Sequence, residues 1–137
     1  MVRLIPGTIT GFTEADRAYV VWGIVVKDVI YVRGDYVSGP TAGTKLLRYI
    51  VPAGRRAYIL ALLADGTASA SFTLSWVSNG APLVYKLRLP GSGVVSYVFT
   101  GALNPDTPAD SGTEIAVTIN ESMPLDVYKI DMRIGLV

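Results

Sequence analysis

Short runs in which apolar and polar residues alternate dominate the sequence. In residues 71–77, Phe72, Leu74 and Trp76 are bulky and apolar, while Ser and Thr fill the positions between them. A period of two places the apolar side chains on one face of a β-strand and the polar ones on the other. The sequence therefore predicts strands that are each buried on one face. Further residues expected to face inward are Leu83, Tyr85, Leu87, Leu89, Val95, Tyr97, Phe99, Ile115, Val117, Ile119, Tyr128, Ile130, Met132, Ile134 and Leu136.

Gly, Pro, Asn and Asp separate these runs and mark turns. Residues 64–66 and 78–80 contain Asp-Gly and Asn-Gly pairs, which tolerate positive φ in tight hairpins, and residues 90–93 form a third turn. This spacing predicts an all-β fold, namely one antiparallel β-sandwich of the jelly-roll kind over residues 1–137, with residues 1–15 as a candidate extended arm. The eight or nine strands are expected near residues 18–26, 28–33, 46–51, 56–63, 70–77, 83–89, 94–99, 113–120 and 125–135.

Two runs are apolar without alternation. Residues 58–63 predict a central strand with a second layer over its outer side. For residues 19–26 three interpretations stay open: burial under the loop at 34–43 or the N-terminal segment, a subunit interface, or a helix capped by residues 13–16. The β-branched residues of this run and Gly23 disfavour the helix. The candidate interface residues are Tyr19, Val21, Trp22, Ile24, Val26, Tyr31 and Tyr36.

Composition excludes most catalytic chemistry. The chain has 137 residues, no cysteine, no histidine and a formal net charge of +1. Without these residues there is no Ser-His or Cys-His nucleophile and no thiolate metal site. The low net charge gives little electrostatic attraction to the phosphate backbone of a nucleic acid. We therefore expect no enzyme, no catalytic residue, no cofactor, no metal and no nucleic-acid partner. The longest apolar run, residues 19–26, is shorter than the ~20 residues of a membrane-spanning helix.

Acidic pairs are the remaining candidates for chemistry. Asp28 with Asp35, and Asp106 with Asp110, each flank a short stretch and could bind Ca²⁺ or act as paired carboxylates. Solvated, turn-forming Asp residues explain both pairs better, because neither has the ligand spacing of a calcium loop.

Three other features have structural interpretations. The glycine-spaced stretches 7–11 and 39–43 lack the lysine of a phosphate-binding loop and are expected to be loops. Trp76 is expected in the core with its N–H hydrogen-bonded. Arg55 and Arg56 are expected in a solvated turn between two strands.

Four segments carry a resemblance to known proteins: the turn at 51–54 leading into Arg-Arg-Ala-Tyr-Ile, the run 87–99, the strand 112–119 and the closing run 125–136. Over residues 46–136 the chain resembles small β-sandwich virion proteins of tailed phages and of viruses of thermophiles, whereas residues 1–45 do not match them. The resemblance implies a capsid, decoration or fibre-associated protein that forms a trimer or lattice, or binds other virion proteins. It also implies a location in the virion or host cytoplasm, in keeping with the lack of a secretory signal at the start of the sequence.

The predicted function is thus a structural role in an assembly, exerted through self-association. The alternative is a carbohydrate- or ligand-binding β-sandwich module that presents Trp22, Tyr31 and Tyr36 as stacking platforms. A third hypothesis is an enzyme that uses carboxylates alone, since glycosidases need no histidine.

Overall fold

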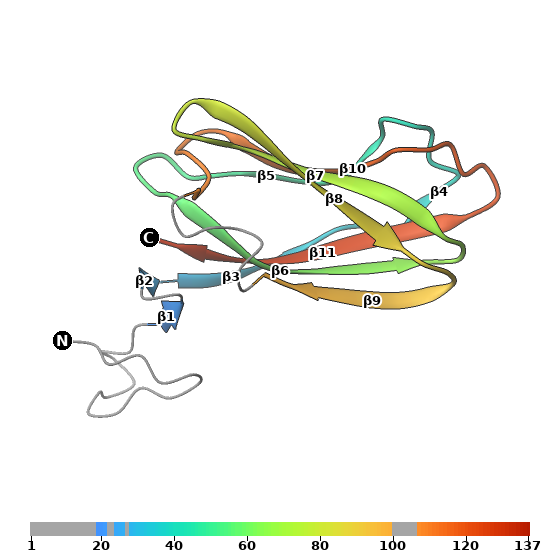
Figure 1. The fold of residues 1–137 in the computed structure, drawn as a ribbon, viewed down its shortest axis with the longest axis horizontal. Helices are drawn as coiled ribbons and strands as arrows, with labels where there is room; N and C mark the ends of the chain where they lie inside the picture. Colours follow the sequence, from blue (N-terminus) through green and yellow to red (C-terminus); the bar gives the residue numbers. More distant parts are fainter. Residues whose placement is uncertain (1–18, 22–23, 27, 100–106) are drawn as a thin grey trace.

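The computed structural model describes residues 19–21, 24–26, 28–99 and 107–137, whose regular structure is entirely β-strand. Nine strands form two antiparallel sheets that lie one above the other (Figure 1). The five-stranded sheet has the order β3 (Asp28–Arg33), β11 (Val127–Leu136), β6 (Ala57–Gly66) and β9 (Gly93–Val98), with β4 (Val37–Ser38) paired to the start of β11. The four-stranded sheet has the order β5 (Lys45–Ile50), β10 (Glu114–Ile119), β7 (Ala70–Ser78) and β8 (Ala81–Leu89).

The strand pairing is that of a jelly roll. β3 pairs with β11, β5 with β10, β6 with β9 and β7 with β8, all antiparallel. The pairs are nested: moving along the chain from β3 to β7, the partner strand moves back from β11 to β8. The chain is therefore one long hairpin rolled up so that successive pairs alternate between the two sheets. The predicted sandwich is confirmed, and β3 and β4 show that residues 28–38 fold with the rest.

The tip of this long hairpin is the turn between β7 and β8. Ser78 pairs with Ala81, and the two residues between them, Asn79 and Gly80, have φ of 51° and 76°. Positive φ at both central positions is what a type I′ turn requires, and its twist matches that of the flanking strands. The hairpin predicted from Asn-Gly is confirmed.

The core lies between the sheets and consists of the predicted inward-facing residues. Phe72, Leu74 and Trp76 of β7 are at most 5% exposed, and those of the other runs are buried or pack against the buried cluster. Trp76 Nε1 donates a hydrogen bond to the Thr107 carbonyl at 2.9 Å, which satisfies its N–H as expected. Alternation predicts this core well because each strand can bury only one face.

The turn predicted at residues 64–66 is wrong. All three residues belong to β6, which continues to Gly66 before the chain crosses to β7 in the other sheet. Gly66 is buried, and a Cβ there would lie 2.4 Å from Tyr128 Cδ1 and 2.6 Å from Leu89 Cδ2. Glycine is needed here for the close approach of two large side chains and not for a turn.

The cover predicted for residues 58–63 is also wrong, although β6 is central as expected, between β11 and β9. Leu63 is 39% exposed on the outer side. The register with β11 shifts where Arg133 pairs with Ala61 and the next residue, Ile134, pairs with Ile59, so Leu60 is the extra residue of a β-bulge. The bulge lets Ile59 and Leu62 both enter the core, which explains the missing alternation.

The run 19–26 is neither one strand nor a helix. It contains β1 (Tyr19–Val21) and β2 (Ile24–Val26), which pair antiparallel with Val21 opposite Ile24. Within the described residues, these strands pair only with each other, and they lie outside the sandwich near β3 (Figure 1). Trp22, the proposed arm 1–15 and the proposed helix cap 13–16 lie outside the described residues.

Candidate functional site

The outer face of the five-stranded sheet carries an unusual mixture of aromatic, charged and apolar residues. Strand register aligns its outward-facing side chains in rows that cross the sheet from β3 to β9. The rows are Tyr31, Arg133, Ala61 and Val98; Arg33, Asp131, Leu63 and Ser96; and Lys129, Asp65 and Val94.

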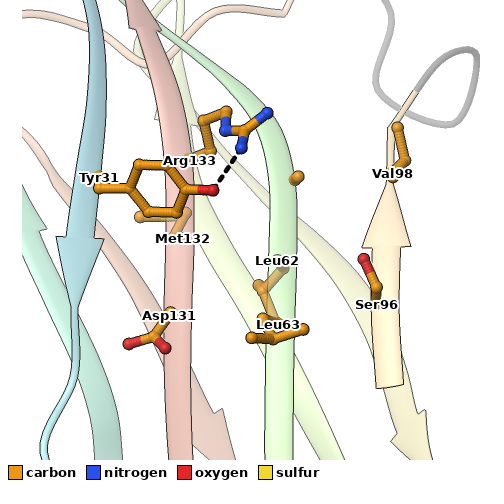
Figure 2. Close-up of a pocket in the computed structure, with 9 residues that line it drawn as sticks. Tyr31, Leu62, Leu63, Ser96, Val98, Asp131, Met132 and Arg133 are labelled. Atoms are coloured by element: carbon orange, nitrogen blue, oxygen red, sulfur yellow. Dashed lines mark hydrogen bonds between the residues drawn. The ribbon is translucent and has the colours of Figure 1, made fainter. Parts of the chain in front are cut away.

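A hollow of about 170 Å³, which we call the outer-face hollow, lies across the first two of these rows (Figure 2). Ala61 has the smallest side chain of its row and separates Arg133 from Val98, which leaves space above the sheet. Leu63 and Val98 add apolar surface, while Asp131, Arg133 and Ser96 add polar groups. Tyr31 lies at the edge of the hollow, and Figure 2 shows its ring face-on above β11.

Tyr31 and Arg133 form a pair beside the hollow. The Arg133 guanidinium carbon lies 4.7 Å from the centre of the Tyr31 ring, and Arg133 also donates a hydrogen bond to the Tyr31 hydroxyl. The cation–π contact restricts both side chains. Within the described residues Arg133 forms no ion pair, so its remaining N–H groups are available to a carboxylate, phosphate or hydroxyl group.

Tyr36 lies beside a second basic residue on the same face. Its hydroxyl donates a hydrogen bond to Asp65 Oδ2 at 2.9 Å, and Lys129 Nζ lies 5.3 Å from its ring centre. The hydrogen bond to the Asp65 carboxylate raises the pKa of the Tyr36 hydroxyl above 10.0, since it favours the protonated form. Tyr36 is therefore held against the sheet although it is 63% exposed.

Asp131 connects Lys129 to the backbone of the segment that follows β3. Its Oδ1 accepts a hydrogen bond from the Gly34 N–H at 3.1 Å, and its Oδ2 lies 3.6 Å from Lys129 Nζ. A Cβ on Gly34 would lie 2.2 Å from the Ile130 carbonyl oxygen, so only glycine lets the chain leave β3 this close to β11. The segment that carries Tyr36 is fixed in this way.

The outer faces of the two sheets differ in polarity. On the four-stranded sheet, β7 and β10 present Ser71, Thr73, Ser75 and Thr118, of which Thr73 and Thr118 lie opposite each other. Glu114 adds charge there, and its hydrogen bonds from Lys45 and Arg48 lower the pKa of its carboxyl. Of the exposed large hydrophobic residues, Val29, Tyr31, Tyr36, Leu63, Val94 and Val98 belong to the five-stranded sheet and its loops, and Ile50 and Val84 to the four-stranded sheet.

The structure places two of the seven candidate interface residues, Tyr31 and Tyr36, on this one face. Sequence reasoning did not single out Arg133, Asp131 or Leu63. The alternating pattern did indicate that Arg133 and Asp131 face outward. It could not indicate that they lie next to Leu63, because β6 and β11 are distant in sequence. The other candidates are Tyr19, Val21, Ile24 and Val26, which lie in β1 and β2, and Trp22, which lies beyond the described residues.

The proposed acidic pairs do not form in the described part of the chain. Asp28 and Asp35 lie at opposite ends of β3, and Asp106 is outside the described residues. Asp28 Oδ2 instead lies 2.6 Å from an Arg55 nitrogen. Nor does any group of three or more potential metal-ligating residues occur among the described residues.

Arg55 and Arg56 lie in the turn between β5 and β6, as predicted, and Arg56 is exposed, but both side chains also have partners elsewhere in the chain. Besides its ion pair with Asp28, Arg55 donates to the Val137 carbonyl, and Arg56 donates to Asn79 Oδ1 at 3.1 Å. Arg56 also lies 3.5 Å from Asp110. The two arginines therefore link the β5–β6 turn to neighbouring loops and strand ends, partners that are distant in sequence.

No known protein family matches the chain, and no curated protein is similar to it in sequence. Among solved structures, it is similar to the CBM22-1–GH10 modules of the N-terminal endo-1,4-beta-D-xylanase 10B of Clostridium thermocellum, complexed with xylohexaose. The match has 14% identity and a TM-score of 0.36, and it covers 78% of this chain and 24% of that chain. A TM-score this low carries no argument about function. No described helix is long and apolar enough to cross a membrane.

Proposed function

We propose that this protein is a non-enzymatic structural component of an assembly and that it works by self-association through the five-stranded sheet. The observation that carries the proposal is the apolar surface on the outer face and edge of that sheet. Val94 and Val98 of β9 are 62% and 68% exposed, and Leu63 of the adjacent strand is 39% exposed. Contiguous exposed apolar residues on a soluble domain mark association surfaces. The resemblance of residues 46–136 to virion proteins supports a virus particle as the assembly.

The difference between the two outer faces supports the choice of sheet. The Ser and Thr residues of the four-stranded sheet are polar and already half-buried, and they gain little from further burial. Burial of apolar side chains stabilises association by roughly 25 cal/mol per Å², so the valines of β9 favour a protein neighbour over water. The isolated hairpin of β1 and β2 is a second element that a neighbour would stabilise, because a two-stranded hairpin alone is marginal in water.

Light scattering over a dilution series tests self-association directly. We expect the wild-type chain to form a stable oligomer, and Val98→Lys to weaken its association at least about tenfold, because a charge would have to be desolvated in the interface. Val84→Lys is the matched control, since Val84 is 63% exposed on β8, the edge strand of the other sheet, and should leave the mass unchanged. A wild-type chain that stays monomeric at every concentration would overturn the proposal.

The outer-face hollow favours carbohydrate binding as a second candidate function. It combines apolar surface from Leu63 and Val98 with the free donors of Arg133, a combination that suits a sugar ring carrying a carboxylate. Calorimetric titration with galacturonate oligomers should show binding that Arg133→Ala weakens at least about tenfold, with Arg88→Ala as the exposed-arginine control. Equal affinity of the two variants, or no heat with the wild type, would exclude this site.

A further inference from the structure

β9 is the least protected of the four sheet edges. Edge strands usually carry charges that prevent pairing with other chains. β3 has Asp28 and Arg33, β5 has Lys45 and Arg48, and β8 has Lys86 and Arg88, whereas β9 (Gly-Val-Val-Ser-Tyr-Val) has no charged residue. Within the described residues it pairs with β6 on one side and with no strand on the other.

The β8 edge beside it is partly blocked. Tyr97 of β9 points between the sheets, where its hydroxyl accepts a hydrogen bond from the Arg88 N–H at 3.0 Å and donates one to the Arg88 carbonyl. These Arg88 groups face away from β7 and would otherwise be free to pair with another strand. Tyr97 therefore satisfies one residue of the β8 edge and leaves the edge of β9 open.

Backbone geometry shows which groups of β9 are available. The Phe99 N–H donates to the Leu60 carbonyl at 3.0 Å, so the hydrogen-bonded pairs between β9 and β6 fall on every second residue from Phe99. Val95 and Tyr97 thus bond to β6. Val94, Ser96 and Val98 point their N–H and C=O groups toward the open edge, and their side chains lie on the outer face.

We propose that β9 pairs antiparallel with β9 of a second copy of this chain, across a two-fold axis at Ser96. This inference rests on the proposed function, since it specifies the edge through which self-association occurs. The sequence around Ser96 is self-complementary in this register: Val94 lies opposite Val98 of the partner subunit, and Val95 lies opposite Tyr97 of the partner subunit.

The register uses every free backbone group in turn. Antiparallel strands exchange two hydrogen bonds at each second pair, and the pairs centred on Ser96 are those whose N–H and C=O groups point outward. Val94 and Val98 form β-branched cross-strand contacts on the outer face, which stabilise sheets. The five-stranded sheets of the two copies become one continuous sheet, and no charge is buried at the new contact.

Cross-linking tests the register, because the chain has no cysteine of its own. In Ser96→Cys the two introduced thiols face each other across a hydrogen-bonded pair, whose Cα atoms are ~5.5 Å apart and within reach of a disulfide. Val94 is another exposed position on the same strand. In Val94→Cys the two introduced cysteines of the dimer are about 13 Å apart along the strands. Under copper-phenanthroline and oxygen, Ser96→Cys should yield disulfide-linked dimer at least about tenfold faster than Val94→Cys.

Proline substitution supplies an independent readout. Ser96→Pro removes an N–H that the single subunit does not use, so the fold is retained while the dimer contact is lost. Val84→Pro does the same on the edge of β8 and should leave the dimer intact, which light scattering and circular dichroism check together.

The outcomes separate this inference from the proposed function. A monomeric wild type overturns both. A wild type that associates while the two cysteine variants cross-link equally, or while Ser96→Pro keeps the wild-type mass, overturns the β9 pairing and leaves self-association standing. A trimer likewise contradicts the pairing, because a two-fold contact closes at two copies.

Discussion

At the scale of single residues, Gly66 illustrates how a side chain that is absent can determine packing. It occupies the position where Tyr128 and Leu89 come closest to the backbone of β6. We expect Gly66→Ala to lower the free energy of unfolding by roughly 1–3 kcal/mol, because the added methyl group would displace two buried side chains. Urea denaturation of the purified variant measures the change.

The matched control for this prediction is Gly91→Ala. A Cβ on Gly91 meets no atom within 4 Å, and its φ is not positive. Its free energy of unfolding should stay within about 0.5 kcal/mol of the wild type. Equal losses at the two positions would show that the contact with Tyr128 and Leu89 is not the cause.

Gly66 also shows where prediction from sequence fails. Asp-Gly is a frequent turn pair, and the residues that make this glycine part of a strand, Leu89 and Tyr128, are distant in sequence. Asn79-Gly80 has the same local character and does form a turn. What distinguishes the two cases is strand pairing, which local residue preference does not reveal. β7 and β8 pair with each other, so a tight turn joins them, whereas β6 and β7 lie in different sheets.

At the scale of elements, the β7–β8 turn is stabilised from another part of the chain. Asp110 accepts hydrogen bonds from the Gly80 N–H at 2.8 Å and the Asn79 N–H at 2.9 Å, and these bonds lower the pKa of its carboxyl below 3.8. Both bonds favour the ionised form, so the carboxylate stabilises the folded chain wherever it is charged.

We therefore expect the effect of Asp110→Asn to depend on pH. Because the folded pKa is lowered, the carboxylate contributes its full stability above the ordinary pKa, at about pH 5 and higher, and loses it as the pH falls through the folded value. Wild type and variant should differ in thermal stability at neutral pH and converge toward about pH 2. Asp35→Asn, which removes a carboxylate from an exposed residue, is the control variant. A difference that is constant with pH would mean that the charge of Asp110 is not its cause.

Strands were more predictable than the surfaces they form. Period-two patterns located the inward-facing residues of β7, β8, β10 and β11, since burial on one face directly selects apolar side chains. The outer-face site depends instead on which strands are neighbours. Tyr31 was recognisable as an exposed aromatic residue, but Arg133 and Leu63 became part of the same site only through the order β3, β11, β6 and β9.

At the scale of the whole molecule, symmetry limits what the β9 edge can build. A two-fold pairing is closed, so it yields a dimer and cannot by itself extend into a lattice or a trimer. An assembly larger than a dimer requires a second, different surface on each copy. Figure 1 shows the hairpin of β1 and β2 outside the sandwich, near the start of β3. β3 and β9 are opposite edges of the five-stranded sheet, so the hairpin and the open edge of β9 are separate surfaces. Contacts there would leave the polar outer face of the four-stranded sheet in water and the outer-face hollow open between them.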